Sequence, residues 1–583
     1  MRTSLKIVGA SGQGIDSIGE VLAKALKRAG FCVFGYREYP SLIKGGHASY
    51  QLDFDSEYVG STETNVNIVI SLNHHGLEHN IPDLKPGGIF IHSTDHWKFP
   101  AEHQKLIKDR GLVVVNMPIE AMLAKLKAKP ILSNVILSAF VWAILEQDID
   151  SLKKMVGEKF AKKKDLLELN MQSIDAGYAY QDETLGKLRV AAPKPNKKWK
   201  DHLLLTGSKA MGLGAAHAGV RLYAGYPMTP SSPLLTYIAG IQNETGMVIK
   251  QAEDEITAAQ IVSGAMFMGT RALTATSGGG FDLMSETLSM NAIIENPSVF
   301  VLAMRPGPAT GLPTWTGQGD LLMAVNTAHG EFTRCVMSVS ESDDAFHLMP
   351  EAFNIAEEYQ ISVIVLTDKQ IAEALYTQAP YDMKRAVIKR GKLVTDAKKL
   401  AKLKGSDRYD PTVADGVSQR WLPGAKAETY CAQGDEHSGD GTVDESAHNA
   451  IAQIDKRLRK ADALLKALPD AELFGDQSPE TLIVGWGSTK TVMLDALLSD
   501  QLKDKKIGYL HYTYLWPLKT GKFEALHKTA KRVILAEGTK MGQLAMMLRM
   551  QTGINIEKQI LKYDGRPFFY DELVESISKL LKK

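Results

Sequence analysis

The 583-residue chain is poor in cysteine, in net charge and in long apolar runs, and each scarcity excludes a class of protein. Cys32, Cys335 and Cys431 lie far apart, without a C-x-x-C pair, so the chain offers no recognisable ligand set for an iron–sulfur cluster or a structural zinc. A formal net charge of +1 provides no overall field for nucleic acid or an acidic membrane. No apolar run reaches membrane-spanning length, and residues 1–8 lack a leader-like apolar core. We therefore expect a cytoplasmic protein without nucleic-acid or membrane partners, and scarce cysteine is typical of a reducing compartment.

The length exceeds what one hydrophobic core supports and predicts two to four domains. Short apolar strands alternate with helical patterns along most of the chain, which predicts the α/β class with three α/β domains. A proline- and lysine-rich stretch without periodicity favours a linker, and weak periodicity after residue 380 favours a connecting segment with an acidic loop and a charged helix. We divide the chain into five parts: an N-terminal domain (1–190), a linker (191–200), a large parallel domain (201–380), a connecting segment (381–478) and a smaller last domain (479–583).

Two glycine-rich loops lie near the N-terminus. G-A-S-G-Q-G, which contains Gly12 and Gly14, stands between a strand and a helix, the geometry that presents backbone N–H groups to a phosphate. Its spacing differs from the dinucleotide fingerprint G-x-G-x-x-G, so a tight turn without a ligand is an equal interpretation. In the second loop, residues 41–50, Lys44 and His47 flank Gly45 and its neighbouring glycine; they could hold a phosphate or carboxylate, or belong to a solvated hairpin turn.

The region from 223 to 330 contains short buried strands that each run into a polar turn. The turns are Y-P-M-T-P-S-S-P at 226–233, T-S-G-G-G at 276–280 and R-P-G-P-A-T-G-L-P-T at 305–314. In a parallel α/β sheet such turns lie at the carboxyl ends of the strands, where ligands bind. Their polar side chains are therefore candidates for a site.

Three adjacent acids, Glu253, Asp254 and Glu255, stand at the start of a predicted helix. The residues alone do not decide between a catalytic carboxyl group and a capping cluster that stabilises the helix dipole. Arg305 follows a strand and suits a carboxylate ligand, although a surface arginine at a strand end is common. Thr229 lies in a rigid turn between two prolines; it could instead cap a helix, a role that Ser231 could equally fill.

One apparent metal motif is rejected. G-D-G at 439–441 begins like the magnesium and diphosphate motif of thiamine enzymes, but that motif needs an Asn about thirty residues later at the end of a strand. A charged helix follows instead. An acidic surface loop is the better interpretation, and we assign no metal site to this chain.

The combined motifs resemble the alpha subunit of 2-oxoacid:ferredoxin oxidoreductases, most closely the 2-oxoglutarate type. The resemblance rests on the three turns above, on E-D-E-I-T-A-A at 253–259, and on E-x-x-x-x-G-Q-L and K-Y-D-G-R-P-F near the C-terminus. The two N-terminal loops resemble the family's gamma domain fused ahead of the alpha part, with Ser11 and Lys44 where the family usually has Gly and Arg. The resemblance implies a gamma domain, a parallel-sheet domain of the pyrimidine-binding thiamine type, and a transketolase-like C-terminal domain.

The resemblance also implies roles for individual residues. Glu255, flanked by Ile256, Ala258 and Ala259, is similar to the glutamate that activates thiamine diphosphate through N1′ of its aminopyrimidine. Catalytic roles are implied for Glu255, Thr229 and Arg305. Thiamine diphosphate contacts are implied for Glu255, Tyr226, Pro227, Met228, Ser277 and Gly278; 2-oxo acid contacts for Thr229, Ser231, Arg305 and Thr310; and CoA contacts for Gly12, Gly14, Lys44 and Gly45.

The implied reaction is oxidative decarboxylation of a 2-oxo acid, with CoA taking the acyl group and ferredoxin the electrons. The chain lacks cluster cysteines and a full diphosphate motif. A beta subunit is therefore expected to supply Mg²⁺, the diphosphate site and a [4Fe-4S] cluster, with thiamine diphosphate shared between the chains in a dimer of alpha–beta heterodimers.

Two other functions compete with this one. A nicotinamide or flavin dehydrogenase would explain the first glycine loop but leaves 226–233 and 305–314 without a role. A non-catalytic scaffold would have no reason to keep Glu255, Thr229 and Arg305 together. Among 2-oxo acids, 2-oxoglutarate is favoured on overall resemblance, with pyruvate and other 2-oxo acids as alternatives.

Overall fold

The structure, a computed structural model, describes residues 2–42, 45–160, 164–186 and 188–582. The described chain forms two compact units. Unit 1 comprises residues 1–205, 374–380 and 569–575, and unit 2 comprises residues 206–373, 381–568 and 576–583. The finer five-part division of the chain stays a prediction.

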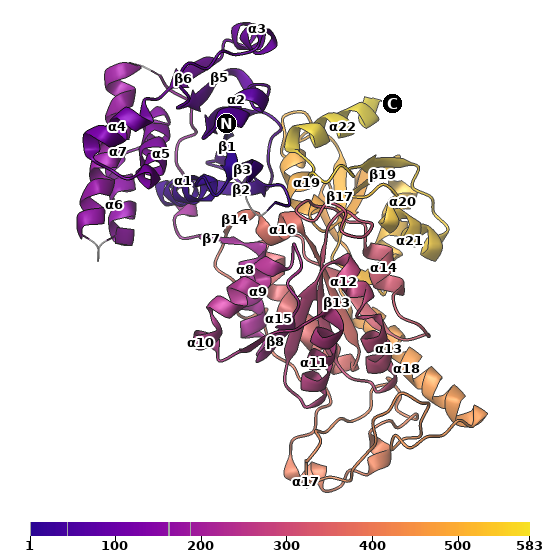
Figure 1. Cartoon of the computed structure of the whole chain (residues 1–583). Coiled ribbons are helices and arrows are strands. Elements are labelled where there is room, and N and C mark those ends of the chain that lie inside the picture. Colours follow the sequence, from indigo (N-terminus) through magenta and orange to yellow (C-terminus); the bar gives the residue numbers. More distant parts are fainter. Residues whose placement is uncertain (1, 43–44, 161–163, 187, 583) are drawn as a thin grey trace. The chain divides into compact units, whose positions relative to one another are not determined.

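Unit 1 is built on an eight-stranded mixed sheet (Figure 1). In spatial order its strands are β6 (Val113–Asn116), β5 (Leu84–His92), β4 (Val66–Ser71), β1 (Thr3–Ser11), β3 (Gly45–Asp55), β2 (Cys32–Glu38), β14 (Leu375–Gln378) and β7 (Leu203–Thr206). Strands β1, β4, β5 and β6 run parallel, whereas β3 pairs antiparallel with both β1 and β2. Strand β3 begins at Gly45, so His47 lies within a strand opposite Ala10. The predicted loop at 41–50 is therefore too long.

Helix α1 (Ile15–Ala29) covers the sheet because its apolar residues recur on one face. Ile15, Ile18, Leu22 and Leu26 are all buried, and the helix ends at Gly30, which has a left-handed backbone. The other helices of unit 1 are α2 (His74–His79), α3 (Ala101–Asp109), α4 (Ile119–Leu126), α5 (Ser133–Ile144), α6 (Ile149–Phe160) and α7 (Lys164–Thr184). Helices α4 to α7 form one group in Figure 1, and α5 is buried along most of its length.

No single helix of the described chain is long and apolar enough to cross a membrane, although the bent pair 119–126 and 130–144 meets the criterion when taken together. The stretch 191–200 packs against unit 1. There Trp199 is buried in the short helix η2 (Lys197–Trp199), and its indole N–H donates to the Ser56 carbonyl at 2.8 Å.

Unit 2 contains a seven-stranded sheet that carries most of the predicted site. Its spatial order is β18 (Tyr514–Trp516), β12 (Arg334–Ser338), β13 (Ser362–Asp368), β11 (Ser298–Met304), β10 (Ala272–Thr276), β8 (Leu222–Gly225) and β9 (Val248–Gln251). All neighbouring strands are parallel except β18, which pairs antiparallel with β12. Every residue of β10, β11 and β13 is buried, as expected for central parallel strands covered by helices on both faces.

The helices of this part follow the strands in the order of an α/β fold (Figure 1). They are α8 (Gly207–His217), α9 (Ser232–Gly240), α10 (Gln242–Thr245), α11 (Glu255–Phe267), α12 (Gly278–Asp282), α13 (Ser285–Ile293), α14 (Leu321–Asn326), α15 (Ser342–Tyr359) and α16 (Lys369–Glu373). The predicted α/β class is thus confirmed.

A five-stranded sheet forms the C-terminal part of unit 2. Its order is β15 (Glu472–Gly475), β17 (Ile507–Tyr512), β16 (Thr481–Trp486), β19 (Arg532–Glu537) and β20 (Lys558–Leu561), with helices α19 (Thr489–Leu497), α20 (Gly521–Thr529) and α21 (Gln543–Thr552). The last helix, α22 (Tyr570–Lys582), belongs to unit 1 up to residue 575 and to unit 2 from residue 576. One hydrophobic cluster joins this sheet to the larger one, with Phe300 and Leu366 on one side and Trp486 and Leu510 on the other.

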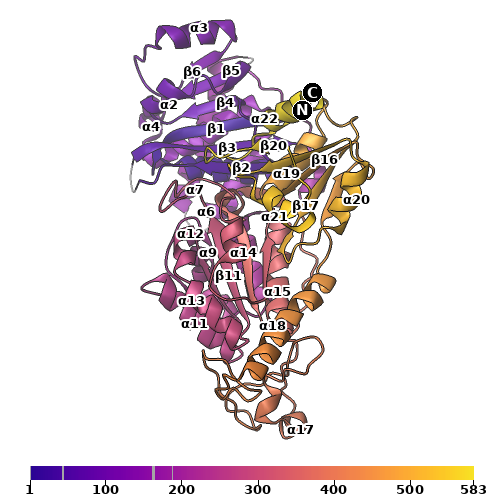
Figure 2. The ribbon, with the colours of Figure 1, turned by 90° about the vertical axis from the view of Figure 1, so that its right-hand side faces the viewer.

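The segment between the two sheets contains α17 (Ala397–Leu400), the short helix η3 (Gly405–Asp407) and the long helix α18 (Ala447–Ala467), which Figure 2 shows as one continuous rod. Buried ion pairs hold this segment in place. Arg390 and Arg420 contact the Glu357 carboxylate, and Lys456 and Lys460 both contact Glu295. Because Glu357 and Glu295 are fully buried, the segment is an integral part of unit 2.

Candidate active site

Four neighbouring strands place the predicted site residues at one edge of the large sheet. The carboxyl end of β11 leads to residues 305–320, that of β10 to 277–280, that of β8 to 226–231 and that of β9 to the start of α11. Since these strands are parallel, the four segments meet at the same edge, where ligands bind in open α/β sheets.

The three acids at the start of α11 have different environments in the structure. Glu253 is exposed, and the Asp254 carboxylate accepts a hydrogen bond from the Thr257 N–H at 2.7 Å, as a helix N-cap does. Glu255 is buried, and its Oε1 atom has no hydrogen-bond partner among the described residues. A buried polar atom without a hydrogen-bond partner lowers the free energy of unfolding. The burial of Glu255 therefore indicates a functional role rather than a structural one.

The Glu255 carboxyl lies against the turn that follows β10. A Cβ atom placed on Gly280 would lie 2.7 Å from Glu255 Oε1 and would also collide with the Thr276 hydroxyl, so only glycine fits there. Thr276 also contacts the Met228 sulfur at 3.8 Å, which brings the turn after β8 to the same place. Of the residues that flank Glu255 in the sequence, Ile256 is 46% exposed, whereas Ala258 and Ala259 are buried.

Arg305 and Thr229 are brought together directly. The Arg305 guanidinium donates to the Thr229 carbonyl at 2.6 Å, across a turn in which the Thr229–Pro230 peptide bond is cis. Partial burial lowers the pKa of Arg305, and the charge of Asp320 opposes that shift. This hydrogen bond fixes the guanidinium beside the turn after β8.

Asp320 is a site residue that the sequence did not single out. Burial and the charge of Asp282 raise the pKa of Asp320 to about 6, while Arg305 acts in the opposite direction. Its Oδ2 atom is buried, has no hydrogen-bond partner in the part of the chain that the structure describes, and lies 3.0 Å from where a Cβ of Gly278 would stand. A single aspartate in a polar loop carries no sequence signal, so only the fold could reveal it.

The C-terminal part of unit 2 holds the loop that follows β11. Gln318 donates to the Trp486 carbonyl at 2.8 Å, and its own carbonyl accepts from the Gly538 N–H at 2.5 Å. The Thr316 N–H donates to the Gly565 carbonyl at 3.0 Å. The motifs around 537–544 and 562–568 therefore support the loop that begins at Arg305.

The remaining predicted site residues of unit 2 differ in their burial. Ser231 is buried and donates to the Met228 carbonyl at 2.6 Å, so its side chain does not cap α9. Ser277 is buried with an unpartnered hydroxyl at the start of α12. Tyr226, Pro227 and Thr310 are exposed.

In unit 1 the predicted glycine turn lines a cavity of about 270 Å³. Gly12 and Gly14 have backbone φ angles of +92° and +94°, which favour glycine, and both line this cavity. Arg37, which forms an ion pair with Asp16, lines it from β2. Gly45 begins β3, and Lys44 lies outside the described residues.

The G-D-G segment near residue 440 is satisfied within its own loop. The Asp440 carboxylate accepts hydrogen bonds from the Ser438 hydroxyl, the Thr442 hydroxyl and the Thr442 N–H, and these bonds lower its pKa to about 2. The carboxylate thus closes a tight turn.

Comparison with known proteins assigns the family. Residues 213–454 match the family described as "Pyruvate flavodoxin/ferredoxin oxidoreductase, thiamine diP-bdg", and residues 4–180 match "Pyruvate ferredoxin/flavodoxin oxidoreductase". A 2-oxoacid:ferredoxin oxidoreductase alpha subunit from a Sulfolobus species is 30% identical over 635 residues, covering 100% of this chain and 97% of the relative. The chain belongs to the 2-oxoacid:ferredoxin oxidoreductase family. It is a subunit of a thiamine diphosphate-dependent enzyme of that family.

Other relatives of this oxidoreductase subunit span the same length. Subunit alpha of 2-oxoacid:ferredoxin oxidoreductase 1 from Sulfurisphaera tokodaii is 30% identical, with coverage of 100% of this chain and 98% of the relative. A solved structure of 2-oxoglutarate:ferredoxin oxidoreductase from Magnetococcus marinus, with 2-oxoglutarate, coenzyme A and succinyl-CoA bound, matches with a TM-score of 0.90 at 29% identity, covering 99% of each chain. The predicted resemblance and the predicted fold are confirmed.

Proposed function

We propose that this chain is the alpha subunit, with a fused gamma-type domain, of an enzyme that oxidatively decarboxylates 2-oxoglutarate with CoA and passes the electrons to ferredoxin. The observation that carries the proposal is the buried Glu255 carboxyl, whose Oε1 atom has no partner, beside the side-chain-free Gly280. The choice of 2-oxoglutarate is supported by the similarity to the Magnetococcus marinus enzyme, which binds that substrate.

Glu255 and its surroundings fit a thiamine cofactor. Thiamine diphosphate, when bound, supplies the carbon centre that adds to the carbonyl of a 2-oxo acid. Glu255 would hold a proton at N1′ of the aminopyrimidine, and the apolar Ala258 and Ala259 keep water away from that carboxyl. The absence of a side chain at Gly280 makes room for the buried Glu255 carboxyl and the Thr276 hydroxyl. Tyr226, Pro227, Met228, Ser277 and Gly278 are proposed as further cofactor contacts.

Arg305 is proposed to bind the substrate carboxylate. Its guanidinium has five N–H donors, and the contact with the Thr229 carbonyl occupies one side of this fork. The Thr229 hydroxyl would orient the reacting carbonyl, and Ser231 and Thr310 complete the proposed substrate contacts. The charge of Asp320 opposes the lowering of the Arg305 pKa by burial.

CoA is proposed to bind at the glycine turn of unit 1. The cavity there is lined by backbone of the turn at Gly12 and Gly14 and by the cation Arg37, which suits the phosphates of a nucleotide. Gly45 and Lys44 are proposed as further contacts.

The complete enzyme requires a partner chain. The three scattered cysteines offer no cluster ligands, so we assign Mg²⁺, the diphosphate site and a [4Fe-4S] cluster to a beta subunit. We further propose that the enzyme is a cytoplasmic dimer of alpha–beta heterodimers with ferredoxin as the electron acceptor. The division of this chain into the five parts given above is also part of the proposal.

The test is made on the complex purified through this chain. A cysteine-rich partner and brown iron–sulfur absorbance are expected, and 2-oxoglutarate with CoA and thiamine diphosphate should bleach that absorbance faster than pyruvate does. Glu255→Gln should abolish the bleaching, whereas Glu253→Gln, a matched change at an exposed acid two residues away, should preserve it. Faster bleaching by pyruvate would refute the choice of substrate, and a colourless protein without a partner would refute the reaction.

A further inference from the structure

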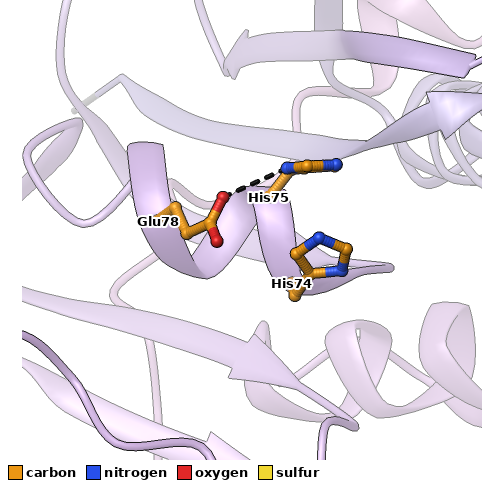
Figure 3. A group of neighbouring side chains, drawn as sticks. All are labelled: His74, His75 and Glu78. Carbon is orange, nitrogen blue, oxygen red and sulfur yellow. Dashed lines mark hydrogen bonds and ion pairs between the residues drawn. The ribbon is translucent and has the colours of Figure 1, made fainter.

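Unit 1 carries a cluster of metal-ligand side chains that the proposed reaction does not use. His74, His75 and Glu78 stand on the first turns of α2, and one ligand atom from each lies within 4.8 Å of the other two (Figure 3). Among the described residues, this is the one group of three or more His, Cys, Asp and Glu side chains with that spacing. The cluster belongs to unit 1, whereas Glu255 belongs to unit 2.

The three side chains already face one another. His75 Nδ1 and a Glu78 carboxylate oxygen are 3.1 Å apart, and the His74 and His75 rings have their centroids 4.0 Å apart. Figure 3 shows the Glu78 carboxylate directed at the His75 ring, with the His74 ring beside them. A fourth candidate is His79, whose Nε2 lies 3.8 Å from the same carboxylate.

The local sequence explains this convergence. Asn73 caps α2 by accepting a hydrogen bond from the Gly76 N–H, which fixes the direction of the first turn. Residues three and four positions apart lie on the same face of a helix, so Glu78 reaches both His74 and His75. All three side chains are exposed, which leaves them free to rotate around an ion.

We propose that His74, His75 and Glu78 bind a divalent transition metal ion. Two imidazoles and one carboxylate suit Zn²⁺, Ni²⁺ or Cu²⁺, whereas Mg²⁺ and Ca²⁺ prefer oxygen ligands alone. Three protein ligands leave a coordination position that His79 or water fills. The ion replaces the contact between His75 and Glu78 by direct bonds from both to the metal.

The site is coupled to the glycine turn of the same unit. Asn73 donates from its side-chain amide to the side-chain oxygen Oε1 of Gln13 at 3.0 Å, and that oxygen also accepts from the Ala10 N–H at 2.8 Å. One hydrogen bond therefore joins the residue before the cluster to the loop between β1 and α1. The metal ion lies at the edge of the sheet where β1 and β4 end.

The experiment measures zinc binding to the full chain without a histidine tag, by equilibrium dialysis and elemental analysis after chelator treatment. One zinc per chain is expected, and His74→Ala and His75→Ala are each expected to weaken binding by at least about tenfold, since a directly bound ligand is lost. Glu78→Gln should also weaken binding. X-ray absorption of the zinc-loaded chain should show imidazole ligands.

His448→Ala is the matched control, because His448 is an exposed histidine outside the cluster. It should leave zinc affinity unchanged, and the thermal melting of all four variants should match that of the wild type. The proposal is overturned if His74→Ala and His75→Ala bind zinc as tightly as the wild type, or if His448→Ala weakens binding as much as they do.

Discussion

Glu255 and Asp254 are adjacent acids at one helix start, and replacing them should have opposite effects on stability. Asp254 caps α11 through a 2.7 Å hydrogen bond to the Thr257 N–H, and loss of such a cap costs about 0.5–2 kcal/mol. Glu255 contributes a buried Oε1 atom without a partner, and such an atom costs about 1–3 kcal/mol. Asp254→Ala should therefore lower the free energy of unfolding of the chain, and Glu255→Met should raise it.

The effects on activity should differ from those on stability: Glu255→Met should lose activity, and Asp254→Ala should keep most of it. Glu255→Met removes the only group proposed to hold a proton at the cofactor, and general acid–base catalysis contributes about 10²–10⁴-fold to rate. We expect at least a hundredfold loss of 2-oxo acid-dependent dye reduction in the reconstituted complex. Asp254→Ala should keep most of the activity per folded molecule, because its carboxylate already bonds the backbone of its own helix.

The assay compares thermal melting of the isolated chain with turnover of the complex for both variants. A stabilised but inactive Glu255→Met protein is the expected result, typical of a residue kept for function at a cost in stability. The reasoning is refuted if Glu255→Met melts below the wild type by as much as Asp254→Ala does, since the carboxyl would then serve the fold. Full activity of Glu255→Met would refute its catalytic role.

Three further changes probe the substrate contact and the buried charges of unit 2. Arg305→Met should lower kcat/KM for the 2-oxo acid by about 10- to 100-fold, because a hydrogen bond to a charged group contributes about 1.5–3 kcal/mol; steady-state kinetics with an unchanged kcat/KM would contradict this. Glu295→Gln leaves Lys456 and Lys460 buried without a counter-charge and should cost about 3–5 kcal/mol in chemical denaturation, whereas a cost below about 1 kcal/mol would contradict the importance of the pairs. Burial raises the pKa of Glu537 from about 4.5 to about 8, so its contribution to stability is full below pH 4.5 and is lost as pH rises to about 8. Glu537→Gln should flatten that part of the stability profile, and an unchanged profile from pH 4 to 9 would contradict the shift.

The sequence predicted the central strands of the large sheet best. Their apolar patterns predict strands at 272–276, 299–303 and 362–366, and the observed bounds of β10, β11 and β13 differ from these by at most two residues. These strands are recognisable because central parallel strands are covered on both faces and are mostly apolar. β12 and β17 went unnoticed because they bury polar side chains. Arg334 of β12 stacks on Phe332, and His511 of β17 bonds to Tyr509 at 2.9 Å.

Helix α18 shows why periodicity failed between 381 and 478. The helix itself was predicted to within three residues at each end, but it buries charged side chains, including Lys456 and Lys460, and exposes the aliphatic Ile451 and Leu458. A hydrophobic pattern identifies a buried face only when burial is apolar. Here the buried partners are carboxylates such as Glu295, which lies far away in sequence, and nothing in a local window indicates them.

The two C-terminal motifs, around 537–544 and 562–568, contact the loop that follows β11. Arg305 follows β11, and the loop after it is held both by the large-sheet part of unit 2, where the Gln370 N–H donates to the Thr316 hydroxyl, and by the smaller sheet. Gln318 spans the Trp486 carbonyl and the Gly538 N–H, and Thr316 bonds the Gly565 carbonyl. The same loop ends at Asp320, which acts electrostatically on Arg305, so the C-terminal part supports the loop that carries both charges while the Thr229 carbonyl holds the guanidinium itself. The smaller sheet therefore serves the proposed substrate site as its support.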